Sequence, residues 1–166
     1  MKSIIYKIKL FVAVLTMCYL FVTTSFADEM TKLNPYDEIE ISEEDIDLMS
    51  RLIYCESRGE SIEGQRAVAE VVLNRCLSSD FPDNVNDVIY QKKQFSTAKM
   101  LSKTTPNKEN IEAVRYVLEN GNTSLETTEY VYFSTGKSNG HEFTKLGNHW
   151  FSKWGQYGKS ILQSKI

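Results

Sequence analysis

The sequence predicts an α+β domain in which helices come first and a small β-sheet or hairpin forms the C-terminal end. Between residues 42 and 120, apolar residues recur at the three- and four-residue spacing of amphipathic helices. The pattern changes at Tyr130–Phe133, where β-branched and aromatic residues follow one another, as is typical of a buried strand. The segment 141–154 can add one or two more strands, interrupted at Gly147.

Residues 1–27 have the pattern of a signal peptide. An apolar run, Leu10–Val22, follows three lysines and precedes the small residues Ser25 and Ala27. We therefore expect cleavage after Ala27 and a secreted protein. An uncleaved membrane anchor is the alternative, although the apolar run is short for a membrane span.

The charge of the remaining chain is acidic. Three of the 19 basic residues precede residue 28 and all 22 acidic residues follow it, which leaves the rest of the chain with a net charge of −6. Nucleic-acid-binding proteins usually show a basic excess, so we expect no nucleic-acid partner. Residues 28–41 form an acidic lead-in that we expect to be exposed and poorly ordered. Residues 42–166 suffice for one domain with a single core.

Four helices are expected in this domain. Ser42 and Asp45 have the spacing of a capping box at the start of the first helix. The second is rich in alanine and valine and should be the central buried helix, because small side chains let neighbours approach closely. Asn120–Gly121 should end the last one. The expected ranges are Glu43 to about Cys55, Ile62–Cys76, Asn84–Tyr90 and Lys108–Glu119.

Glu56 is the first candidate for catalysis. It lies at the end of an apolar helix, just before Gly59, which we expect to permit a backbone turn. A carboxyl group there can be half-buried and still face a cleft, and desolvation favours the protonated form that a general acid needs. The alternative is an ordinary solvated surface group.

An ordered series of motifs resembles the spore cortex-lytic, cell wall hydrolase family (SleB/CwlJ type). The matching segments are Cys55–Glu60, Gly64–Gln65, Ala67–Ala69, Val72–Arg75, Phe81–Pro82, Val88–Tyr90, Gln94–Phe95, Tyr132–Phe133 and Gly147–Phe151. The resemblance implies a lysozyme-like helical catalytic core and assigns the role of catalytic acid to Glu56. It also implies lytic transglycosylase activity on the peptidoglycan of spore cortex or vegetative wall, with no cofactor.

Further residues are candidates for binding the glycan. They are Glu60, Asn74, Gln94, Phe95, Tyr132 and His149. Glu60 can instead order the hinge between the first two helices, residues 58–63, or cap the second helix. Asn74 can cap the end of that helix, and Tyr132 can pack in the core. Glu70 is a further carboxylate, for which we expect a surface position rather than a buried one.

Other function classes remain open at this point. A muramidase-type hydrolase would use a second carboxylate, with Glu60 and Glu70 as candidates. A zinc amidase needs about three protein ligands, and after residue 27 the chain has only His141 and His149 without a metal-binding motif, so we expect no metal. Cys55 and Cys76 can form a disulfide, but we expect two buried thiols. A non-catalytic wall-binding protein is a further alternative, and an accessory protein for targeting is an open partner.

Overall fold

The computed structural model describes residues 4, 10–13, 16–17, 33–136 and 143–153. The chain divides into two units, residues 1–33 and 34–166, and the second contains the folded domain. Most of the predicted signal peptide lies outside the described residues. Within the part of the chain that is described, no helix has the length and apolar character needed to cross a membrane.

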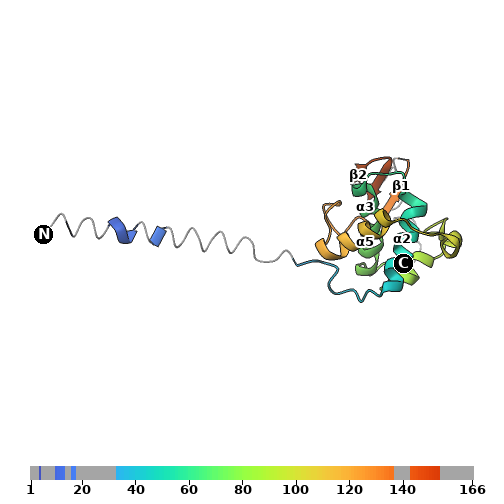
Figure 1. Ribbon diagram of the computed structural model, residues 1–166, viewed down its shortest axis with the longest axis horizontal. Helices are drawn as coiled ribbons and strands as arrows, with labels where there is room; N and C mark the ends of the chain where they lie inside the picture. Colours follow the sequence, from blue (N-terminus) through green and yellow to red (C-terminus); the bar gives the residue numbers. More distant parts are fainter. Residues whose placement is uncertain (1–3, 5–9, 14–15, 18–32, 137–142, 154–166) are drawn as a thin grey trace, which may run out of the picture. The chain divides into compact units, whose positions relative to one another are not determined.

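The helices form where local sequence signals place them (Figure 1). Their bounds are α2 Glu43–Ser57, α3 Ile62–Leu77, α4 Val85–Tyr90, the 3-10 helix η1 Ala98–Lys103 and α5 Lys108–Asn120. Ser42 caps α2 and forms the predicted capping box with Asp45. Asn107 caps α5 in the same way with Asn110. At the end of α5, Gly121 has a φ of +74°, a conformation that glycine adopts readily.

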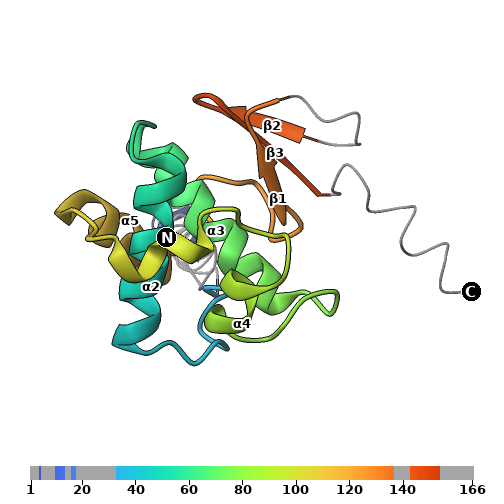
Figure 2. The same cartoon turned by 90° about the vertical axis from the view of Figure 1, so that its right-hand side faces the viewer.

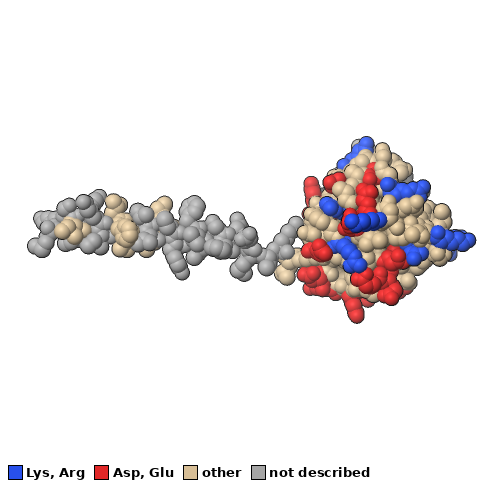
Figure 3. Space-filling model, viewed as in Figure 1, with Lys and Arg blue, Asp and Glu red and all other residues tan. Residues whose placement is uncertain are grey.

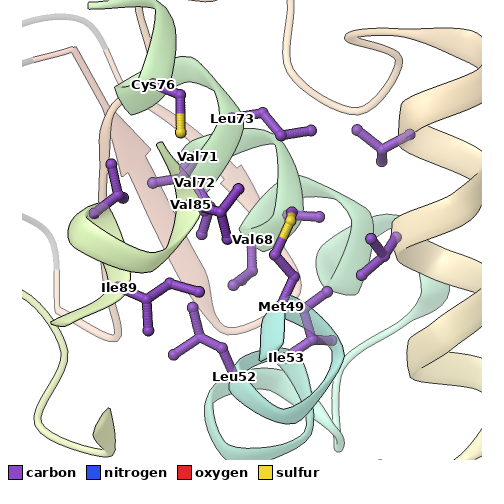
Figure 4. Close-up of a cluster of buried hydrophobic side chains, with 14 of the residues drawn as sticks. Met49, Leu52, Ile53, Val68, Val71, Val72, Leu73, Cys76, Val85 and Ile89 are labelled. Carbon is purple, nitrogen blue, oxygen red and sulfur yellow. The ribbon is translucent and has the colours of Figure 1, made fainter. Parts of the chain in front are cut away.

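The core gathers around α3, which packs against α2, α4, α5 and the sheet. Almost every residue from Gly64 to Cys76 is buried, because the alanines and valines of α3 meet neighbours on all sides. Figure 4 shows side chains of α2 and α4 meeting those of α3. The labelled members are Met49, Leu52, Ile53, Val68, Val71, Val72, Leu73, Cys76, Val85 and Ile89. The prediction of a central buried helix is therefore confirmed.

The C-terminal end forms a three-stranded antiparallel sheet in the order β1-β3-β2. The strands are β1 Tyr132–Ser134, β2 Phe143–Leu146 and β3 His149–Ser152. Phe133 pairs with Phe151 in β3, and Leu146 pairs with His149 across the turn at Gly147. Figure 2 shows the sheet beside the helices at one end of the domain. The predicted α+β class with a small C-terminal sheet is thus confirmed.

The lead-in differs from its prediction. Tyr36 is buried, and its hydroxyl contacts the side-chain oxygens of Asn74 at 2.8 Å and Asn122 at 3.2 Å. The Asn34 side chain also donates a hydrogen bond to the carbonyl of Leu118 at 2.5 Å. The prediction of an exposed lead-in is therefore wrong for this part, because one aromatic side chain anchors it in the core. The sequence around Tyr36 is polar, so composition alone did not reveal this anchor.

Candidate active site

Glu56 lies in the last turn of α2, half-buried, as its position in the sequence predicted. The Thr97 hydroxyl donates a short hydrogen bond to its Oε1 atom. Among the described residues, Oε2 has no hydrogen-bond donor, so this oxygen is open to a ligand. Thr97 therefore holds one oxygen of the Glu56 carboxyl group, and the other oxygen is open to a ligand.

The turn after Glu56 does not depend on glycine in the expected way. Arg58 ends α2 in a right-handed helical conformation, and Gly59 has no left-handed φ. A β-carbon placed on Gly59 would meet no atom within 4 Å. The predicted conformational role of Gly59 is therefore wrong, and the Ser61 side chain, which caps α3 through the Gly64 N–H, marks the new helix start.

Thr97 is a site residue that the sequence interpretation missed. It lies two residues after Phe95, which with Gln94 was a candidate for glycan binding, so its neighbours carried the signal. Thr97 lies 41 positions from Glu56, and the loop reaches α2 because Phe95 is buried against the core. Gln94 itself is half-buried, and its backbone N–H bonds the carbonyl of Gln91.

Replacing Thr97 with valine should reduce turnover without unfolding the domain. Valine keeps the shape but removes the hydroxyl that orients the Glu56 carboxyl group, so we expect kcat to fall about 10-fold, the effect of one hydrogen bond. Steady-state assays on purified peptidoglycan would measure this. Thr97→Ser keeps the hydroxyl and should retain most activity. Equal rates for Thr97→Val and the wild type would contradict the role given to Thr97.

Arg75 contacts both the sheet and the loop that carries Thr97. Its guanidinium group is buried, and Nε donates to the carbonyl of Val131 at 2.7 Å. The guanidinium carbon lies 4.9 Å from the ring centre of Phe95 and 5.6 Å from that of Tyr132. Burial lowers the pKa of Arg75 to about 10. Arg75 therefore links α3 to β1 and to the loop that carries Thr97.

Asn74 lies in the core rather than at a substrate surface. It is fully buried, its amide donates to the carbonyl of Tyr130 at 2.9 Å, and its oxygen accepts the Tyr36 hydroxyl hydrogen bond. Neither the predicted helix cap nor the predicted glycan contact describes this arrangement. Asn74 instead joins the lead-in and the segment before β1 to the central helix.

Glu60 connects the hinge to the sheet. Its Oε2 accepts the backbone N–H of Asn148 and its Oε1 accepts the Asn148 side-chain amide, both at 2.9 Å. Gly147 beside it has a φ of +59°, and a β-carbon there would overlap Glu60 Oε2. Glu60 therefore orders the hinge, which is one of the two structural roles predicted for it, and does not cap α3.

The ionisation of Glu60 should be visible in the Asn148 amide. The backbone hydrogen bond from Asn148, followed by the side-chain hydrogen bond, lowers the pKa of Glu60 below its usual value, although desolvation opposes this. A carboxyl pKa lowered by folding stabilises the native state above the unfolded-state pKa, and this stabilisation is lost as the pH falls through the folded-state pKa. An NMR titration should show the Asn148 amide shifting with a midpoint below that of a free glutamate. Glu60→Gln should remove this transition, and a midpoint at or above the free value would contradict the contact.

Glu70 is fully buried in α3, which corrects the expectation of a surface position. Its Oε1 accepts the backbone N–H groups of Thr123 and Ser124 at 2.9 and 2.8 Å. Its Oε2 accepts that of Leu125 at 2.7 Å. Burial raises the pKa of Glu70, while these N–H groups act in the opposite direction. Both oxygens are therefore occupied in holding the loop after α5.

Two predicted ligand-contacting side chains lie on the sheet. Tyr132 is half-buried, and its ring meets that of Phe81 edge-on at 5.9 Å. His149 is buried and packs edge-on against Phe133 at 5.3 Å, with its Nδ1 atom buried and without a partner among the described residues. Both rings therefore contribute to the aromatic packing of the sheet.

The cysteines and metal ligands were also open questions. Cys55 and Cys76 are free thiols, Cys55 half-buried with its sulfur 3.3 Å from the Thr104 hydroxyl. Cys76 is buried, and burial raises its pKa to about 12. In the ranges that the structure describes, no group of three or more His, Cys, Asp or Glu side chains is placed to hold a metal ion.

The arrangement defines a small helical domain with a half-buried carboxyl group, Glu56, at the end of α2 and a three-stranded sheet at the C-terminal end. The chain belongs to the cell wall hydrolase family, whose model matches residues 59–156. Solved structures and curated relatives are also similar to this chain, and their names describe the same class of protein.

Two solved structures share the fold. The catalytic domain of the germination-specific lytic transglycosylase SleB from Bacillus anthracis matches with a TM-score of 0.58 and 32% identity, over 67% of this chain and 95% of that one. The catalytic domain of the Bacillus cereus SleB protein matches with a TM-score of 0.60 and 32% identity, over 73% and 98% of the two chains.

The curated relatives are named spore cortex-lytic enzymes. That of Bacillus cereus is 35% identical over 117 residues, which is 68% of this chain and 45% of the relative. That of Oceanobacillus iheyensis is 51% identical over 55 residues, which is 33% of this chain and 20% of the relative. The chain thus spans less than half the length of these relatives.

Proposed function

We propose that this protein cleaves the glycan strands of peptidoglycan as a lytic transglycosylase, with Glu56 as the single acid and base. The observation that carries the proposal is the contrast among three carboxylates. Glu56 has an oxygen without a donor among the described residues, whereas both oxygens of Glu60 and of Glu70 accept hydrogen bonds from the protein. A chemistry that needs one carboxyl group fits this arrangement.

The reaction requires Glu56 to act twice. The protonated carboxyl group gives its proton to the glycosidic oxygen as the bond to the anomeric carbon of the muramyl residue breaks. The C6 hydroxyl of the same sugar then bonds to that carbon, and the Glu56 carboxylate takes the hydroxyl proton. The products are a 1,6-anhydromuramyl end and a free hydroxyl on the leaving sugar, and Glu56 is protonated again.

A muramidase-type hydrolysis would need a second carboxylate that activates water or forms a covalent intermediate. The two candidates considered for it, Glu60 and Glu70, already hold the β2–β3 turn and the loop 123–125. This engagement favours attack by the substrate's own hydroxyl.

The test is mass spectrometry of the muropeptides that the folded domain releases from purified spore cortex and from vegetative wall. We expect 1,6-anhydromuramic ends, and the substrate that yields them identifies the natural target. Reducing sugar ends would show hydrolysis, and free stem peptides would show an amidase. Release from neither substrate would support the non-catalytic wall-binding alternative.

Export is part of the proposal. We infer that residues 1–27 direct secretion, because charged, apolar and small-residue segments follow one another there. N-terminal sequencing of secreted protein should begin at Asp28. Recovery of the chain with an intact Met1 in membranes would favour the anchor instead.

A further inference from the structure

A cationic hollow lies beside the loop that carries Thr97. The segment 91–108 contains five lysines and no acidic residue, in a chain whose net charge is −3. Three of these lysines, Lys92, Lys93 and Lys99, line an open hollow of about 510 Å³ between α4 and η1. Figure 3 shows basic side chains at the right-hand edge of the domain, where Figure 1 draws the yellow segment around η1.

Within the part of the chain that the structure describes, the lysines of this hollow have no ion-pair partner. All three are exposed, and none forms an ion pair with a described residue. Lys93 also has a φ of +69°, a left-handed conformation that is uncommon for a residue with a side chain. Like charges brought together without counter-charges create a site where an anion binds favourably.

The charge of the hollow specifies the kind of ligand. Three exposed lysines without an ion-pair partner among the described residues favour an anion. The Oε1 atom of Gln91 also lacks a hydrogen-bond donor among the described residues, but it is buried, so a ligand in the hollow does not reach it. In the proposed substrate the anionic groups are the carboxylates of the peptide stem.

The hollow belongs to the loop that contacts Glu56. Ser96 and Ala98 line it, and Thr97 between them donates to Glu56. The same loop therefore lines the hollow through Ser96 and Ala98 and contacts Glu56 through Thr97. We propose that this hollow binds the carboxylate-bearing peptide stem of the muramyl residue at the cleavage site. The proposal rests on the proposed function, since it assigns a second contact to the same substrate.

The test compares two double variants on two substrates. Lys92→Gln with Lys99→Gln removes two charges from the hollow, and Lys103→Gln with Lys108→Gln removes two from the same segment outside it. The substrates are glycan strands with intact stems and the same strands stripped of stems by an amidase. We expect kcat/KM of the hollow variant to fall about 5- to 10-fold on stem-bearing strands, mainly through KM, and less than about 2-fold on stripped strands. The control pair should lose less than about 2-fold on both.

A binding measurement separates this proposal from the proposed function. The soluble stem tripeptide, L-alanyl-D-glutamyl-diaminopimelate, added to the wild-type chain should shift NMR amide signals of residues 91–99, and these shifts should disappear in the hollow variant. If the wild type cleaves neither substrate, the proposed function fails, and this binding result still decides the hollow. Equal losses on both substrates, equal losses in the control pair, or perturbation by a teichoic acid polymer but not by the peptide would overturn the proposal.

Discussion

Replacing Glu56 with glutamine is expected to reduce peptidoglycan cleavage by about 10³-fold or more, which is the contribution of a positioned general acid and base. Glutamine has nearly the same shape and can still accept the Thr97 hydroxyl hydrogen bond at its carbonyl oxygen. It cannot supply a proton to the glycosidic oxygen or take one from the attacking hydroxyl. The loss should therefore appear in kcat rather than in substrate binding.

The measurement is release of soluble muropeptides over time, together with thermal unfolding of the variant. Glu112→Gln is a matched control, because Glu112 lies on α5 in an exposed ion pair with Lys108. Both variants should unfold near the wild-type temperature, and only Glu56→Gln should lose activity. If Glu56→Gln kept a tenth of the wild-type rate, Glu56 would not be the proton donor.

Replacing Glu70 with glutamine is expected to destabilise the domain by about 2–3 kcal/mol, the cost of a buried polar group that loses its partner. Backbone N–H groups point at both carboxylate oxygens, two at Oε1 and one at Oε2. The amide of glutamine has one acceptor oxygen, so its NH₂ group must face an N–H donor in either orientation. The side-chain volume is unchanged, so the loss reports hydrogen bonding and charge rather than packing.

Denaturant unfolding of the wild type and the variant measures this difference. The same change at exposed Glu112 should alter the free energy of unfolding by less than about 0.5 kcal/mol. A similarly small effect at Glu70 would mean that the loop 123–125 does not depend on this carboxylate. Because Glu70 lies far along α3 from the hinge, residual activity of the folded fraction should stay close to the wild type.

Features encoded by neighbouring residues were predicted well. The capping box of Ser42 and Asp45, the end of α5 at Gly121 and the division of the last strands at Gly147 each involve positions a few residues apart. Their signals are therefore visible in a short window of sequence. The place of Glu56 in the last turn of α2 follows from the same helical period.

Features that depend on distant partners were not predictable in this way. The sequence predicted a surface position for Glu70. Its partners, the N–H groups of 123–125, are backbone atoms that no pattern of side chains reveals. Tyr36 was predicted to belong to an exposed lead-in, because its partners Asn74 and Asn122 lie far along the chain from it. The link between Glu60 and Asn148 spans 88 positions, and only the folded sheet brings the two together.

That last separation has a consequence for when the protein becomes active. Glu56 is made early, Thr97 follows 41 positions later, and the sheet that Glu60 holds closes only with β3, which ends at Ser152. Contacts between such distant positions form late, because the intervening chain must first be ordered. A chain that is still emerging, or one that stops before β3, therefore contains Glu56 but lacks the completed sheet. The order of the residues along the chain therefore delays completion of the sheet, and with it the proposed activity, until most of the domain has been made.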